Sequence, residues 1–213
     1  MISIVKIKIM IEMILMIFFI FMVSPLYISY FLHILCYNQE KGGRMMAFEK
    51  IDINTLDMNT FQAIGKDWML ITAGDHQKVN TMTASWGGMG VLWGQNVVYA
   101  FIRPQRYTKQ FVDQQECFSL SFFDGYKKEL SVLGTVSGRD LDKINHVHFH
   151  TTYIDGVPTF EEARLVFIVE KIYEDDIKPE NFKDTSLDTK WYPDQDYHRV
   201  YIAKIKGVYV QRT

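Results

Sequence analysis

Residues 199–211, RVYIAKIKGVYVQ, alternate between apolar and polar side chains. A period of two is typical of a β-strand whose two faces meet different surroundings. Further apolar or alternating runs predict strands over residues 68–72, 79–86, 96–103, 117–123 and 164–173. Strands therefore dominate the predicted structure, and no internal repeat or low-complexity linker follows residue 45.

Between these runs the sequence predicts only short helices. Thr108 is the predicted N-cap of a helix that extends to Gln114, with Phe111 and Val112 facing inward. Two more helices are predicted over residues 127–133 and 139–144, and the glycine-rich residues 87–90 predict a break in regular structure. Closely spaced strands with short helical inserts favour a mainly β protein, a small barrel rather than a doubly wound sheet.

The composition is that of a globular protein without a nucleic-acid-binding surface. The chain has 213 residues, of which 48% are hydrophobic, and its formal net charge is −2. This length suits one domain with a sizeable core, and the absence of a basic excess argues against a nucleic-acid partner. The two cysteines, Cys36 and Cys117, establish no disulfide framework and fit a reducing compartment such as the cytoplasm.

Residues 1–44 differ from the rest of the chain. No Asp, Glu, Lys or Arg occurs from Met13 to Tyr37, which taken alone is the pattern of a transmembrane anchor. The segment KGGR at 41–44 can instead be encoded by a purine-rich ribosome-binding sequence just before a start codon for Met45 or Met46. We therefore interpret residues 1–44 as a hydrophobic leader translated from too early a start codon, with a membrane anchor as the alternative. Residues 45–213 are then the folded domain.

Three segments carry candidate binding residues. In NTMTASWGG (80–88) a strand ends in small residues and glycine, which lets a flat ligand approach the backbone. The alternative is an ordinary strand with threonines on its solvent-exposed face. FIRPQRYT (101–108) places two arginines before helix N–H groups, which suits a phosphate, or else forms a solvated basic turn. GTVSGRDLDK (134–143) is a polar loop or a capped helix start.

In order and spacing, these segments resemble the flavin reductase-like family, whose fold is the FMN-binding split β-barrel. FSLSFF (118–123), FEEARLV (160–166) and DYHRVYI (196–202) add to the resemblance, which extends from about Asp67 to Val210. It implies a homodimer with FMN near the subunit interface and the phosphate held around Arg106, Tyr107 and Thr108. The flavin contacts that it implies are Asn80, Thr81, Thr83, Ala84, Ser85, Trp86, Arg103, Arg106, Tyr107, Thr108, Ser137 and Lys143.

The resemblance implies an FMN-dependent oxidoreductase that passes electrons from NADH or NADPH to a second flavin, a metal centre or a partner protein. Such a role suits a sequence without a catalytic triad or paired carboxylates, because the cofactor carries the hydride chemistry. Two alternatives stay open. One is an FMN electron carrier that resembles flavoredoxin and is reduced by a partner protein, and the other is a membrane-anchored flavin-binding protein without turnover.

Several histidines and tryptophans invite a functional interpretation. His198 is a candidate substrate contact or a strand-edge histidine. His146, His148 and His150 would share one face of an extended segment and could bind a metal, but a polar surface edge is the interpretation that we favour, and we predict no metal site. Trp68, Trp86, Trp93 and Trp191 do not discriminate among the candidate functions, because aromatic side chains are more often core than cofactor contacts.

Overall fold

The computed structural model describes residues 48–212, which lie within one compact unit, Met46–Thr213. Within these residues eight strands form one antiparallel sheet in the order β3-β2-β6-β9-β10-β5-β4, with β1 added at β10. The strands are β1 (Phe48–Ile51), β2 (Met69–Gly74), β3 (Val79–Ala84), β4 (Gly87–Leu92), β5 (Gln95–Ile102), β6 (Cys117–Phe122), β9 (Leu165–Asp176) and β10 (Arg199–Gln211). A separate hairpin is formed by β7 (Thr151–Ile154) and β8 (Val157–Phe160).

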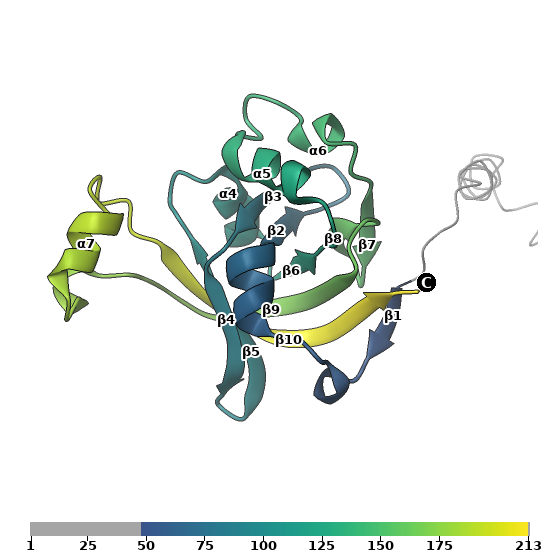
Figure 1. The fold of residues 1–213 in the computed structure, drawn as a ribbon, viewed down its shortest axis with the longest axis horizontal. Helices are drawn as coiled ribbons and strands as arrows, with labels where there is room; N and C mark the ends of the chain where they lie inside the picture. The colour runs from purple at the N-terminus through teal and green to yellow at the C-terminus, as the bar shows by residue number, and fades with distance from the viewer. Residues whose placement is uncertain (1–47, 213) are drawn as a thin grey trace, which may run out of the picture. The chain divides into compact units, whose positions relative to one another are not determined.

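Short helices connect the strands. They are α3 (Thr60–Gln62) with the π-helical turn η2 (Ala63–Asp67), α4 (Tyr107–Gln114), α5 (Lys127–Thr135), α6 (Lys143–His146) and α7 (Thr185–Trp191), besides the 3-10 turns η1 (Ile53–Thr55) and η3 (Pro179–Asn181). Figure 1 shows α4, α5 and α6 together on one side of the curved sheet, whereas α7 projects from it on the connection between β9 and β10. Within residues 48–212 no helix is long and apolar enough to span a membrane.

The sheet curls because its two edge strands are neighbours in the chain. β3 lies at one end of the strand order and β4 at the other, yet only Ser85 and Trp86 separate them. The sheet must therefore bend until its edges approach each other, which produces a barrel that is split along one seam. The seam places the end of β3 beside the start of β4, and the candidate site lies there.

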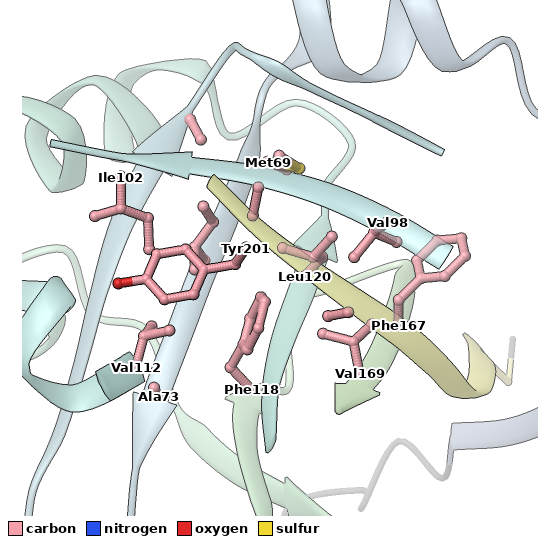
Figure 2. Close-up of a cluster of buried hydrophobic side chains, with 14 of the residues drawn as sticks. Met69, Ala73, Val98, Ile102, Val112, Phe118, Leu120, Phe167, Val169 and Tyr201 are labelled. Carbon is pink, nitrogen blue, oxygen red and sulfur yellow. The ribbon is translucent and has the colours of Figure 1, made fainter. Parts of the chain in front are cut away.

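The barrel encloses a core of aliphatic and aromatic side chains (Figure 2). Phe118 on β6 and Tyr201 on β10 are fully buried and meet edge to face, with ring centroids 6.5 Å apart. The Tyr201 hydroxyl donates a hydrogen bond of 2.5 Å to Asp113 Oδ1 at the end of α4. Burial, then this carboxylate, raises the pKa of Tyr201, so the phenol stays protonated and ties α4 to the barrel.

The predicted strands are confirmed, and the strand over 199–211 has the predicted bounds. The break expected at 87–90 is wrong, because these residues form β4 and pair with β5 from Gly87↔Ala100 to Leu92↔Gln95. The Tyr99 ring covers Gly88, where an added Cβ would lie 3.6 Å from it. Backbone pairing with a neighbouring strand thus overrides the low strand propensity of glycine.

Two helix predictions also need correction. Thr108 is not an N-cap, since Arg106 holds that position and Thr108 is the second residue of α4. Its buried hydroxyl instead accepts a hydrogen bond of 2.9 Å from Asn80 Nδ2, which joins α4 to β3. The helix expected over 139–144 begins only at Lys143, because Asp142 caps it by accepting from the Asn145 amide.

The sequence predicted that His146, His148 and His150 share one extended segment, and this prediction is wrong. His146 ends α6, and His148 has a φ of 58°, a left-handed conformation that is incompatible with an extended strand. His150 Nδ1 lies 2.7 Å from Glu162 Oε1, a surface pair. Across residues 48–212 no group of three His, Cys, Asp or Glu side chains is placed to hold a metal ion.

Candidate functional site

A cavity of about 410 Å³ opens at the seam of the barrel. Sites for small molecules and cofactors commonly have volumes of roughly 300–1,000 Å³. Three parts of the chain line this cavity: the end of β3, the segment after β5, and the segment that leads from α7 into β10. Its lining residues are Met82, Thr83, Ala84, Ser85, Trp86, Phe101, Arg103, Gln105, Arg106, Trp191 and His198.

The end of β3 offers backbone groups to this cavity. Among the described strands β3 pairs only with β2, so its other edge has no strand partner. The Thr83 hydroxyl donates to the Leu130 carbonyl of α5 at 2.5 Å, and Thr83 lines the cavity together with Ala84, Ser85 and Trp86. An unpaired strand edge next to a cavity can bind the polar rim of a flat heterocycle.

Arg106 contributes a positive charge that no carboxylate neutralises. Its Nη1 donates to the Gly134 carbonyl at 2.7 Å, and no Asp or Glu of residues 48–212 forms an ion pair with it. Burial, and after it the nearby Arg103, lowers the pKa of Arg106. A half-buried cation beside a second cation is electrostatically unfavourable by itself, so the site favours an anionic ligand.

Arg103 is engaged differently. Its Nη1 forms an ion pair with Asp196, and its Nη2 donates to the Trp191 carbonyl at 2.8 Å. Gln105 Nε2 donates to the same Asp196 carboxylate at 2.5 Å. Arg103 therefore lines the cavity while it fastens the segment that follows α7.

His198 is buried at the wall of the cavity. Its Nδ1 shares a hydrogen bond of 2.9 Å with the Tyr192 hydroxyl, and its ring lies 5.1 Å from the Trp86 ring between centroids. Burial, and then the charges of Arg103 and Arg106, lower the pKa of His198 to about 4. At neutral pH the imidazole is therefore uncharged, and it can donate or accept a hydrogen bond without adding a charge.

The structure brings seven of the predicted site residues to this cavity and places six elsewhere. Those at the cavity are Thr83, Ala84, Ser85, Trp86, Arg103, Arg106 and His198. Those outside its lining are Asn80, Thr81, Tyr107, Thr108, Ser137 and Lys143. Thr81 is fully buried and hydrogen-bonded to Thr72 at 2.8 Å, so the alternative of a threonine on a solvent-exposed face is wrong for this residue, and its flavin contact stays a prediction.

Lys143 and Tyr107 have partners of their own. Lys143 is buried, and its Nζ donates to the carbonyls of Leu133 at 2.7 Å and Val136 at 3.0 Å, which caps the end of α5. Burial, with a smaller effect of Arg106, lowers the pKa of Lys143 to about 8. The Tyr107 hydroxyl accepts from Lys78 Nζ at 2.8 Å. Asn80 and Lys143 line a separate polar hollow of about 360 Å³.

Four lining residues carried no assignment from the sequence. Gln105 lies inside the arginine-containing segment 101–108, so the sequence could have predicted it as a lining residue. Met82 and Phe101 face the cavity from strands whose period of two does not reveal which face borders a ligand. Trp191 lies far from the other segments in sequence, and its side chain is 41% exposed rather than core.

No protein-family model matches the sequence, and no curated protein matches it significantly. Solved structures do resemble it in fold. An FMN-binding domain of a flavin reductase-like enzyme from Shewanella baltica OS155 aligns with a TM-score of 0.57 at 13% identity, over 79% of this chain and 80% of that chain.

Two further structures align over a similar extent. Flavoredoxin from Methanosarcina acetivorans has a TM-score of 0.53 at 20% identity and covers 77% of this chain and 76% of its own. The FMN-binding protein from Thermus thermophilus with bound p-hydroxybenzaldehyde has a TM-score of 0.54 at 19% identity, with coverages of 77% and 82%. Sequence resemblance and tertiary structure thus agree, and the chain has the split β-barrel fold of FMN-binding flavin reductase-like proteins and flavoredoxins.

Proposed function

We propose that this protein binds FMN at the seam cavity and is an oxidoreductase that passes electrons from NADH or NADPH to a downstream acceptor. The observation that carries the proposal is the half-buried Arg106, which has no carboxylate partner within residues 48–212 and lines the same cavity as the end of β3, whose outer edge has no strand partner. An anionic ligand with a flat, polar-edged ring satisfies both features. FMN has this combination of a phosphate and a heterocycle.

In this proposal the chain's residues bind and orient the cofactor. Arg106 and the N-terminus of α4 would hold the phosphate, and the backbone from Ala84 to Trp86 would contact the ring. Bound FMN would supply the hydride chemistry. The uncharged His198, directly before β10, would border the site and serve as a hydrogen-bonding contact for the substrate. Asn80, Thr81, Tyr107 and Thr108 would support these segments from behind.

A second candidate function is an FMN electron carrier that a partner protein reduces. It is favoured by the partial exposure of Trp86 and Trp191, at 39% and 41%, since both rings at the cavity are reachable from solvent. The two functions differ in whether a nicotinamide reduces the bound flavin.

A homodimer and a cytoplasmic location remain predictions from the sequence.

The first test is a visible spectrum of the purified protein, followed by FMN titration and anaerobic addition of NADH or NADPH. Bound flavin that bleaches quickly with either nucleotide is the expected result. Flavin that binds but stays oxidised would favour the electron carrier. A protein that takes up no FMN would contradict both.

Replacing Arg106 tests the observation on which the proposal rests. Arg106→Gln should weaken FMN binding roughly 10- to 100-fold, because a charge-assisted hydrogen bond is removed. The matched control is Arg212→Gln, which removes an arginine whose side chain is 62% exposed and pairs with Glu49 at 3.1 Å. Equal FMN affinities of the two variants, measured by flavin fluorescence, would exclude Arg106 as a ligand.

A further inference from the structure

The connection between β9 and β10, residues 177–198, projects from the barrel and then returns to it (Figure 1). We call this connection the strap. It carries α7, whose last residue is Trp191, and it ends at His198, directly before β10. Trp191 and His198 both line the seam cavity, so a segment outside the sheet completes the wall of the site.

Side-chain contacts fasten the returning part of the strap to the segment after β5. Asp196 is the anchor on the strap, with a side chain that is only 15% exposed. It pairs with Arg103 and accepts a hydrogen bond from Gln105 at 2.5 Å. Arg103 also binds the Trp191 carbonyl at 2.8 Å and lies 5.3 Å over the Tyr192 ring. One arginine thus holds the strap at three points.

The strap presents an aromatic surface at the cavity. The rings of Trp191 and Trp86 meet edge to face, with centroids 5.0 Å apart and an interplanar angle of 87°. Both indoles remain about two-fifths exposed, and both line the cavity. Partly exposed tryptophans around a cavity offer surfaces on which a planar ring can stack.

We propose that the strap retains FMN in the cavity, with Trp191 as the residue that covers the flavin and Asp196 as the residue that positions the strap. This inference rests on the proposed function and deepens it, because it makes FMN a resident prosthetic group and not a flavin released after each reduction. To leave, the flavin must lose its contact with Trp191 and displace a segment that Arg103 and Gln105 hold in place.

The dissociation rate of FMN tests the inference directly. The purified full-length chain is loaded with FMN and diluted, and the rise in flavin fluorescence reports release. Trp191→Ala should accelerate release roughly 10- to 100-fold, the range expected for the loss of one aromatic stack, whereas Trp191→Phe should stay close to the original protein. Asp196 is not itself a lining residue of the cavity, but it holds the lining residues Arg103 and Gln105. Asp196→Asn should therefore accelerate release at least 5-fold.

Matched controls lie on the same strap. Leu187→Ala removes an exposed side chain of α7, and Asp194→Asn removes a carboxylate two residues before the anchor, where the side chain is exposed. Both controls should release FMN within twofold of the original rate. The melting temperature of each apoprotein separates a loosened strap from a damaged barrel, since only the release rate should change.

The outcomes distinguish a failure of FMN binding from a failure of the strap to retain FMN. An original protein that binds no FMN would refute the proposed function. An original protein that binds FMN, with Trp191→Ala releasing it at the same rate as Leu187→Ala, would leave that function standing and refute the strap. Should Asp196→Asn fail to fold, the release rates of Trp191→Ala and Trp191→Phe decide whether the strap retains FMN. The Trp191 side chain is partly exposed, so both variants should fold.

Discussion

His198 shows how the surroundings of one residue determine its charge. It is flanked by Arg103 and Arg106 and buried against Trp86 and Tyr192, and its pKa falls from 6.5 to about 4. The unfolded chain therefore takes up a proton near pH 6.5, whereas the folded chain takes it up only near pH 4. The contribution of His198 to the free energy of unfolding is therefore fully present above pH 6.5 and is lost progressively as the pH falls toward 4.

Removing the titrating group should remove this pH dependence. Between pH 7 and pH 4 the free energy of unfolding of the original protein should fall by on the order of 3 kcal/mol through His198. His198→Asn should lack this contribution, so its stability deficit at pH 7 should shrink as the pH is lowered. Urea unfolding at several pH values measures the difference, and His76→Asn, at an exposed position outside the cavity lining, is the control. Parallel curves for the original protein and His198→Asn would contradict the lowered pKa.

At the scale of elements, the β2–β3 hairpin contains a buried pair of hydroxyls. Thr81 donates to the Ile71 carbonyl at 3.1 Å, so its oxygen is the acceptor for the Thr72 hydroxyl 2.8 Å away. Both threonines are fully buried. Neither hydroxyl can turn to solvent, and their pairing belongs to the sheet rather than to the cavity.

A double-mutant cycle should expose this pairing. Thr81→Val strands the Thr72 hydroxyl without an acceptor and should cost about 1–3 kcal/mol, because the orphaned group stays buried. Thr72→Val should cost less, and the double variant should be more stable than the sum of the single effects predicts. Additive free energies from urea unfolding would contradict the pairing. FMN affinity should be unchanged in Thr81→Val, whereas a loss would return Thr81 to the flavin contacts implied by the resemblance.

At the scale of the whole molecule, β10 joins the two halves of the barrel. It pairs with β5 on one side and β9 on the other, and it also pairs with β1 near its end. Its Tyr201 meets Phe118 of β6 across the core (Figure 2). Changes at this contact should therefore affect global stability, while changes at the surface should not.

Phe118→Ala should lower the free energy of unfolding by about 3–5 kcal/mol, because a fully buried ring is replaced by a cavity. The melting temperature should fall by roughly 10 °C for a domain of this size. The matched control is Phe61→Ala, since the Phe61 side chain is 90% exposed and its removal should change stability by less than about 0.5 kcal/mol. Similar melting temperatures for the two variants would contradict the assignment of Phe118 to the core.

The sequence by itself determined most strands and predicted seven of the residues that line the seam cavity. The period of two identified the strand over residues 199–211 with the bounds it has in the structure, because the pattern depends only on alternating faces. The segment FIRPQRYT also predicted Arg106, which lines the cavity, since arginines before a helix suit an anion wherever the helix lies. The motifs in their order also indicated the split barrel, which the solved structures confirm.

Tertiary structure decided what depends on distant partners. β4 exists because Gly87 to Leu92 pair with β5, which no local propensity of glycine indicates. The Thr81 hydroxyl pairs with Thr72 and is fully buried because β3 packs one face into the barrel. Trp191 reaches the cavity only because Asp196 returns to Arg103, 93 positions earlier in the chain. Such contacts join residues that are remote in sequence, and a pattern of neighbouring side chains carries no information about which remote segment will be met.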